Sequence, residues 1–284
     1  MPISTIILNS SNVVPNTHNT VYSYKFPNQI ELKNKKIAIH SLNMYYSWYN
    51  VNNQLYNNNF LQYQWWDSTG VLQTYDVVLS DGNYTIGDLN FVLQAAMFKN
   101  GHYVQDNNQT TKNIYYIEIT ENITEYAAEI NLSPVPISLP ANQIKGGNWA
   151  LPTTQQTPRL IFSSSSKFKE LLGFNAGVYP PTSQSTLYRV LSQNVPMISP
   201  VSSIVIRCNA CRSFLSNPFD ILFSFTAGTT RYGDIIDKNP QNLIFIDVPD
   251  GSYSDINLTF VDQNFNEMHI LDNQLVIQII IMDK

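Results

Sequence analysis

The sequence predicts an all-β fold of many short antiparallel strands, and three observations support this prediction. Strand-like alternation recurs along the chain, as in "VYSYKF", where Tyr22, Tyr24 and Phe26 share one face. Turns rich in Asn, Gly, Pro and Ser separate such segments. The last apolar run, at 275–282, is apolar on nearly both faces, as in an interior strand. A sandwich, a jelly roll or a barrel accounts for this pattern.

The other strand candidates follow the same rule. In "NIYYIEIT", Tyr115, Ile117 and Ile119 alternate with polar residues. In "DINLTFVD", Ile256, Leu258 and Phe260 do the same. Further strands are predicted at 36–48, 60–66, 71–79, 201–208, 219–226 and 243–248.

One or two short helices interrupt the strands. The segment 85–98 has Thr85 as a helix N-cap, Asp88 in a capping-box position and Gly101 at its end. One apolar face follows the helical period: Ile86, Leu89, Leu93, Ala96 and Met97. Because this helix has no reactive residues, we expect it to cover a sheet edge or the end of a barrel.

A shorter helix is predicted in "SSSSKFKELLGF", which carries Phe168, Leu171 and Leu172. A Ser is expected to cap it. Gly173 stands where a left-handed residue ends a helix, and Phe174 can pack back on the last turn.

Domain organisation is predicted to be simple. The 284 residues suffice for one large β domain or two modest ones. The segment 131–160 contains five Pro and a Gly pair, so it reads as a long irregular insertion between strands. The sequence therefore predicts one domain over 1–284 with an insertion at 131–160, which either projects outward or contacts a neighbouring subunit.

Composition indicates a surface that is meant to be covered. Charged residues make up 13%, against roughly 25% in an ordinary soluble domain, and there are 17 Tyr, 14 Phe and 4 Trp. A subunit interface explains this balance, and so does a large core. Trp48, Tyr49, Trp65 and Trp66 are the candidate interface residues, and a core role stays open for each.

Several classes of protein are disfavoured. The net charge is −5 and no Lys/Arg-rich patch occurs, so direct nucleic-acid binding is not expected. The start of the sequence has no positively charged region of the kind found in signal peptides. The run at 275–282 is far shorter than the roughly 20 residues of a membrane span. Two Cys in 284 residues exclude a disulfide framework and favour a reducing compartment.

The motifs that carry chemistry are few. "RCNACR" places Cys208 and Cys211 in a C-x-x-C, which could be half a zinc site or a redox pair. Both uses need partners that the sequence does not display, and in an extended strand the two thiols would face opposite sides. Structural, buried cysteines are therefore predicted. The four His are scattered in the sequence: His18, His40, His102 and His269. No catalytic residue, cofactor or metal ligand is predicted, and the chain is not expected to be an enzyme.

Five segments, in order, are similar to one family. They are "NTHNTVYSYKFPNQIELKNKKIAIHSLNMYYSWYNV", "DGNYTIGDLNFVLQ", "KELLGFNAGVYP", "VIRCNACRSFLSNPFDILFSFTAGTTRYGDII" and "DGSYSDINLTFVDQNFNEMHILDNQLVIQIII". Together they resemble the penton, or minor capsid, proteins of virophages and Maverick/Polinton-type elements. In that family an Asn-rich lead-in, a strand, a P-x-x-I-x-L turn and an aromatic end follow one another. Here these map to Asn19, Pro27, Ile30, Leu32 and the run 47–51. The resemblance covers nearly the whole chain except 131–160.

The resemblance implies a single viral jelly roll that forms homopentamers at the vertices of an icosahedral shell. The implied partners are other copies of itself and a double-jelly-roll major capsid protein. The implied location is the virion capsid, after synthesis and assembly in the host cell cytoplasm. The family has no catalytic residues, and no ligand-binding residue is carried over.

Two further hypotheses stay open beside this one. A jelly-roll carbohydrate-binding or host-attachment module would also use exposed Trp and Tyr, because their rings stack on sugars. An enzyme of unrecognised type is the third.

Overall fold

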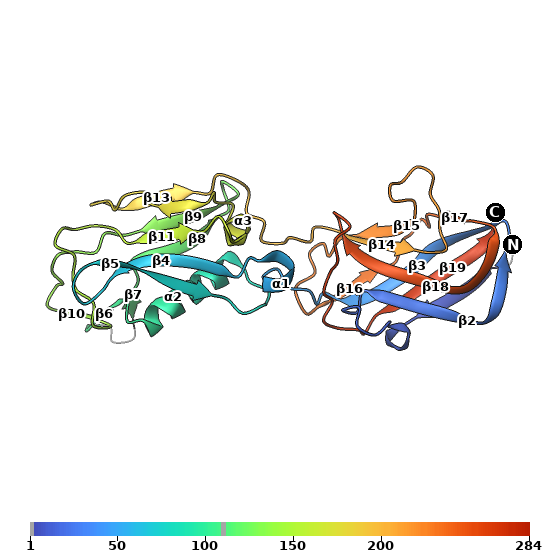
Figure 1. The fold of residues 1–284 in the computed structure, drawn as a ribbon, viewed down its shortest axis with the longest axis horizontal. Coiled ribbons are helices and arrows are strands. Elements are labelled where there is room, and N and C mark those ends of the chain that lie inside the picture. Colours follow the sequence, from blue (N-terminus) through green and yellow to red (C-terminus); the bar gives the residue numbers. More distant parts are fainter. Residues whose placement is uncertain (1–2, 109–111) are drawn as a thin grey trace. The chain divides into compact units, whose positions relative to one another are not determined.

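The computed structural model describes residues 3–108 and 112–284 (Figure 1). Strands from the first 49 residues and from 201–284 form two antiparallel sheets. In the first sheet β1 (Ile3–Leu8), β19 (Val276–Asp283), β3 (Lys35–Tyr45) and β16 (Ile235–Lys238) follow one another, and β17 (Ile246–Val248) also pairs with β3. In the second sheet the order is β15 (Ile221–Phe225), β14 (Ile204–Cys208), β18 (Gly251–Asp262) and β2 (Val21–Leu32). A 3-10 turn, η1 (Ser10–Asn12), follows β1.

The order of these strands is that of an eight-stranded jelly roll. With β16 and β17 counted as two pieces of the sixth strand, the first sheet contains strands one, eight, three and six in chain order. The second sheet contains strands five, four, seven and two. This arrangement is a double-sheet jelly roll, so the predicted fold class is confirmed.

The core of the jelly roll lies between the two sheets. Alternating residues point inward, so the second sheet contributes Ile256, Leu258 and Phe260 of β18, all fully buried as the sequence predicts. The first sheet contributes Ile277 and Ile279 of β19 to the same cluster. Because β19 lies between β1 and β3, the prediction that the last apolar run forms an interior strand is also confirmed.

The chain divides into two compact units. Unit 1 comprises residues 1–49 and 201–284 and contains the whole jelly roll. Unit 2 comprises residues 50–200. The sequence predicts one domain over 1–284, whereas the structure inserts a second unit between β3 and β14. The physical reason is that residues 50–200 bury an apolar core of their own.

Unit 2 has three small antiparallel sheets in its described residues. The first contains β12 (Gly177–Tyr179), β11 (Arg159–Phe162), β4 (Phe60–Trp66) and β5 (Leu72–Val78). The second contains β13 (Tyr188–Leu191), β9 (Ala127–Leu132) and β8 (Ile117–Asn122). The third contains β10 (Gln143–Lys145), β6 (Val104–Asp106) and β7 (Asn113–Ile114). Three helices accompany them: α1 (Asn53–Tyr56), α2 (Ile86–Lys99) and α3 (Phe168–Leu172).

The segment 131–160 is part of unit 2 and packs into its core. It is irregular over most of its length, as predicted, but it includes β10 and joins β9 to β11. Val135 is fully buried and pairs with Gln156 in an isolated bridge. The Trp149 side chain is also buried, and its indole N–H donates to the carbonyl oxygen of Gly101 at 2.8 Å. A role in contacting a neighbouring subunit stays a prediction.

Helix α2 begins and ends where the sequence predicts. The Thr85 hydroxyl accepts the amide N–H of Asp88 at 3.1 Å, and the Asp88 carboxylate accepts the Thr85 amide at 2.8 Å. At the other end the His102 N–H donates to the carbonyl oxygen of Met97, and Gly101 has a φ of +74°. Of the predicted apolar face, Ala96 is half-buried and the rest is buried: Ile86, Leu89, Leu93 and Met97.

The same helix covers a sheet edge. α2 packs against β8, which is the last strand of its sheet. The side-chain oxygen of Asn90 accepts the amide N–H of Ile119 in β8 at 2.9 Å. An unpaired edge N–H would invite another strand. This bond satisfies one such N–H, and together with the packing of α2 on β8 it agrees with the bracing role expected of the helix.

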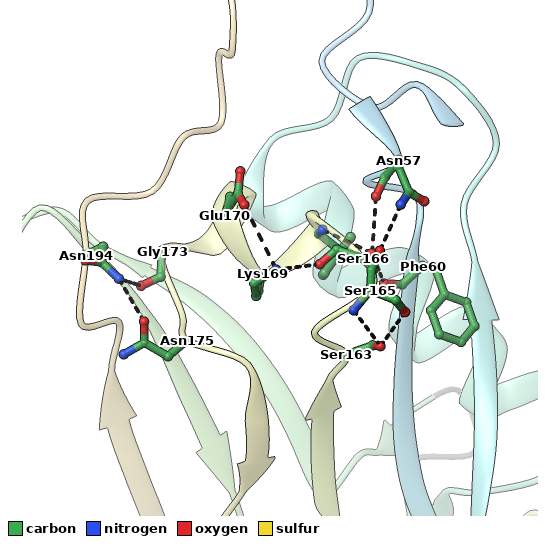
Figure 2. Close-up of polar contacts among 11 residues, drawn as sticks. Asn57, Phe60, Ser163, Ser165, Ser166, Lys169, Glu170, Gly173, Asn175 and Asn194 are labelled. Carbon is green, nitrogen blue, oxygen red and sulfur yellow. Dashed lines mark hydrogen bonds and ion pairs between the residues drawn. The ribbon is translucent and has the colours of Figure 1, made fainter. Parts of the chain in front are cut away.

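Helix α3 is tied to β4 by polar contacts, which Figure 2 shows. Its N-cap residue is Lys167, so the expected Ser does not occupy the N-cap position. Ser166 acts one residue earlier and accepts the amide N–H of Phe168 at 3.1 Å. The Ser166 hydroxyl also donates to the carbonyl oxygen of Phe60 at 2.9 Å. The side-chain amide of Asn57 donates to the carbonyl oxygen of Ser165 at 2.8 Å.

Gly173 ends α3 in the left-handed conformation that the sequence predicts, with a φ of +75°. The N–H of Phe174 donates to the carbonyl oxygen of Lys169 at 2.9 Å, and the Phe174 side chain is buried. The backbone N–H of Asn194 donates to the Gly173 carbonyl oxygen at 2.9 Å. The Asn194 side-chain amide donates to the same oxygen at 3.4 Å (Figure 2). This close approach leaves no room for a side chain, because a Cβ at Gly173 would lie 2.1 Å from the Asn194 carbonyl oxygen.

The Gly173→Ala variant is predicted to destabilise unit 2. The left-handed conformation costs an L-residue about 1–2 kcal/mol, and the clash with Asn194 adds about 1–3 kcal/mol. Gly70→Ala is the matched control, since Gly70 has a φ of +83° but a Cβ there would meet only Ala150 at 3.8 Å. Urea unfolding followed by tryptophan fluorescence measures both variants, because Trp65, Trp66 and Trp149 belong to the core of unit 2. Equal losses of stability in the two variants would contradict the prediction.

Candidate functional site

The predicted interface residues lie mostly inside the two units. Trp65 and Trp66 are buried in unit 2, and Trp48 is buried in unit 1 with its ring 4.3 Å from that of Tyr46. Tyr49 is half-buried and keeps some exposed surface. The structure therefore gives all three Trp a core role, and a part in subunit contact stays a prediction.

An aromatic groove lies on unit 1. It has a volume of about 480 Å³, and the following residues line it: Tyr45, Tyr46, Ser47, Tyr232, Gly233, Leu271, Asp272 and Asn273. Tyr232 is 42% exposed, and its ring centre lies 5.9 Å from that of Tyr46 and 6.2 Å from that of Tyr49. Partial burial raises the pKa of Tyr232, with Tyr49 as a further cause, so its hydroxyl is protonated at neutral pH.

The floor of the aromatic groove is held in place by backbone contacts. The amide of Leu271 donates to the carbonyl oxygen of Ser47 at 2.8 Å, and that of Asp272 donates to the Ser47 hydroxyl at 3.1 Å. The groove thus combines fixed aromatic faces with a carboxylate and an amide. Such a surface can stack against a sugar ring or receive an aromatic side chain of another molecule.

The 212–220 loop, between β14 and β15, exposes a run of apolar side chains. Leu215 is fully exposed at 101%, Phe214 is 78% exposed and Phe219 is 55% exposed. The Arg212 guanidinium lies 5.5 Å from the ring centres of both Phe214 and Phe219. An exposed cluster of this kind is typical of a contact surface between proteins.

The cysteine pair lies in a turn at the end of β14. Both thiols are buried, as predicted, but they do not face opposite sides, because β14 ends at Cys208 and the chain turns there. The amide of Cys211 donates to the Cys208 carbonyl oxygen at 3.3 Å within this turn. The hydrogen bond to the Cys208 side chain, together with burial, raises the pKa of the Cys211 thiol. A thiol held protonated in this way is a poor nucleophile.

A buried histidine centre lies in unit 2. Nδ1 of His102 is 2.9 Å from the Tyr63 hydroxyl, which in turn accepts a hydrogen bond from Asn100 at 2.9 Å. The imidazole stacks on Trp65, with ring centres 5.6 Å apart, and meets Tyr75 edge-on at 4.4 Å. Burial lowers the pKa of His102 to about 4 and raises that of Tyr63 to about 12, so both are neutral at pH 7.

Sequence reasoning missed a second histidine grouping. His18 and His269 are 251 positions apart, yet their rings stack in unit 1 with centres 3.6 Å apart. Glu267 lies beside them, and the ligand atoms of these three residues are all within 4.8 Å of one another. Within residues 3–108 and 112–284 this is the one group of three such side chains. Spacing rules could not find it, because the turns that bring the rings together are far apart in the chain.

None of the helices that the structure describes has the length and apolar character that a bilayer crossing needs.

The fold and these surfaces define a β-rich protein with a jelly roll and an inserted second unit. Among solved structures, the chain is similar to the mavirus penton protein, with a TM-score of 0.48 and 11% identity over 99% of this chain and 97% of that one. It is also similar to a chain of the Sputnik virophage structure, with a TM-score of 0.42 and 10% identity over 100% and 99% of the two chains. No protein-family model and no curated protein matches the sequence.

The buried His102 is predicted to make the stability of unit 2 depend on pH. Its pKa is about 4 in the folded protein and about 6.5 in the unfolded chain, so between these values only the unfolded chain binds the proton. The free energy of unfolding therefore falls as the pH is lowered from 6.5 to 4, by up to about 3 kcal/mol at 1.36 kcal/mol per pKa unit. Urea unfolding at several pH values measures this slope. The His102→Gln variant should have a shallower slope, and parallel profiles for the two proteins would refute the assignment.

Proposed function

We propose that this protein is a structural virion protein, a penton capsomer that forms homopentamers at the icosahedral vertices of a virophage-like capsid. The observation that carries the proposal is the ordered series of five segments that resemble the penton family. Three of them supply most of the jelly-roll strands: the first supplies β2 and β3, the fourth supplies β14 and β15, and the last supplies β18 and β19. The second and third lie in unit 2. Single jelly rolls are a common architecture of capsid proteins.

The 212–220 loop is the proposed contact between copies. A five-fold ring needs a head-to-tail interface, in which one surface of each copy meets a different surface of the next. The centre of such an interface is rich in aromatic and Arg side chains and poor in other charges. Phe214, Leu215 and Phe219, with Arg212 stacked over two of them, have this composition.

The aromatic groove is a receiving surface of matching chemistry. Its Tyr rings can accept the side chain of Phe214 or Leu215 from the neighbouring copy, whereas a charged partner would lose hydration there. A low content of charged residues, 13% of the chain, agrees with a surface that is covered on assembly.

A Phe214→Ser/Leu215→Ser double variant is predicted to prevent ring formation while leaving the fold intact, since both side chains are exposed. Negative-stain images are taken of the unmodified protein alone and of its mixture with a double-jelly-roll major capsid protein, and five-fold rings are expected at least in the mixture. Circular dichroism checks the fold of the variant. The matched control is Ile123→Ser, which removes an 81% exposed apolar side chain from unit 2.

The mixture with the major capsid protein is the sample that tests pentamer formation, because an isolated penton can stay monomeric until its neighbours are present. Absence of rings in both samples of the unmodified protein would reject the penton assignment. Rings that persist in the double variant would reject only the 212–220 loop as the contact.

Carbohydrate binding is the second candidate function, and the aromatic groove is the observation that favours it. Tyr232 offers an exposed ring face, and Asp272 and Asn273 offer oxygen and nitrogen atoms that can bond sugar hydroxyls. A host-attachment module would use such a surface.

If this second function holds, a glycan array should retain the unmodified protein and lose the Tyr232→Ala variant. Tyr126→Ala is the control, because Tyr126 is a 73% exposed Tyr of unit 2 outside the groove. Carbohydrate binding at this groove is rejected if no glycan retains the unmodified protein, or if the Tyr232→Ala variant is retained equally well.

A further inference from the structure

His18, Glu267 and His269 combine two imidazoles with one carboxylate on the surface of unit 1. Their ligand atoms lie within 4.8 Å of one another, and Nε2 of His18 is 4.0 Å from the nearer Glu267 oxygen. From this grouping we infer that the three side chains form a binding site for a divalent transition-metal ion, with Zn²⁺ as the ion that fits best. The site is independent of the proposed virion role.

The loop that carries His18 is fixed before any ion binds. The Thr17 hydroxyl donates to the Val14 carbonyl oxygen at 2.7 Å, and the Thr20 hydroxyl donates to that of Thr17. His18 and Asn19 both have left-handed backbones, with φ of 48° and 57°. The imidazole of His18 is therefore presented from a closed turn rather than from a free loop.

Two hydrogen bonds join this turn to the segment between β18 and β19 that carries His269. The amide of Ile270 donates to the carbonyl oxygen of His18 at 3.0 Å. The side-chain amide of Asn19 donates to the carbonyl oxygen of Ile270 at 2.8 Å. These bonds hold the two histidines side by side, which explains why their rings stack at an angle of only 19°.

Glu267 and His269 are placed on one face by the burial of their neighbours. Met268 and Ile270 are buried in the core of unit 1, so the residues that alternate with them point outward. The turn before them is held by Asp262, whose carboxylate accepts the amide of Asn266 at 2.8 Å. All three proposed ligands thus come from backbone that is already anchored.

The donor set suits Zn²⁺. Neutral imidazole nitrogen and carboxylate oxygen bind this ion at about 2.0–2.2 Å, and two His with one Glu form a known three-ligand set that leaves a fourth position open to water. Ligand atoms in a tetrahedral site are about 3.4 Å apart at these bond lengths. The atoms here must therefore close by up to about 1.4 Å. The stacked rings must also turn so that their in-plane nitrogen lone pairs meet at one point, a movement that needs side-chain rotation of the exposed His18 and Glu267 and the half-buried His269. Other metal ions prefer other donor atoms: thiolates favour Cu(I), and all-oxygen sites favour Mg²⁺ or Ca²⁺.

An ion bound there would act as a cross-link within unit 1. It would connect the turn before β2 to the segment between β18 and β19, and so join residues from opposite ends of the sequence. Because the folded chain binds the ion and the unfolded chain lacks the arranged site, the ion would raise the melting temperature.

Isothermal titration of the full chain with ZnCl₂ at pH 7.5, after removal of any His tag, tests the site. One saturable Zn²⁺ per chain is expected, with a rise in melting temperature that a chelator reverses. His18→Asn, Glu267→Gln and His269→Asn should each weaken binding at least about tenfold. Asn is chosen at position 18 because it tolerates the left-handed backbone. His40→Asn, at an exposed His on β3, is the matched control and should bind as the unmodified protein does.

Titration with Co²⁺ supplies a second readout. A site of imidazole and carboxylate gives only weak visible absorption, whereas binding to the cysteine pair would add an intense thiolate-to-metal band that Cys208→Ser removes. The inference is overturned if Zn²⁺ binding does not saturate, if His18→Asn and His269→Asn bind unchanged, or if the thiolate band accounts for the bound ion.

Discussion

The burial of one apolar layer between two antiparallel sheets is the constraint on which unit 1 depends. Each of its central strands points alternate residues into that layer, so a shift of one residue would expose the whole inward set. The pairing of β3 with β19 and of β2 with β18 fixes this register across long stretches of chain. Register shifts occur at Gln278/Ile279 and at Tyr253/Asp255, and pairing continues beyond both.

Residues 50–200 are inserted in the chain between β3 and β14. The entropic cost of closing a loop grows only slowly with its length, so an inserted unit costs little more than a long loop. Unit 2 offsets its own ordering entropy with a separate core around Tyr63, Trp65 and Phe168.

The sequence was informative at several features that a local rule governs. The period of two placed the inward residues of β18, and the capping box placed the start of α2. The division into units was not visible, because short strand-like segments and turns continue through residues 50–200 as they do on either side. Trp65 and Trp66 were ambiguous for a related reason: they are adjacent in β4 and point to opposite faces, and both faces are covered in unit 2. The pairing of His18 with His269 depends on tertiary structure and has no local signal.

The interrupted order of unit 1 has a consequence for synthesis on the ribosome. Residues 50–200 emerge as one continuous stretch and can condense as soon as they are made, since domains generally fold as units. β1 and β2 emerge first, yet each lies at the end of a sheet beside a strand made last, β19 and β18. The earliest strands of the chain must therefore wait, with unsatisfied backbone groups, through the synthesis of the entire inserted unit. During that interval they are open to pairing with other nascent chains, and chaperone protection is most valuable for them then.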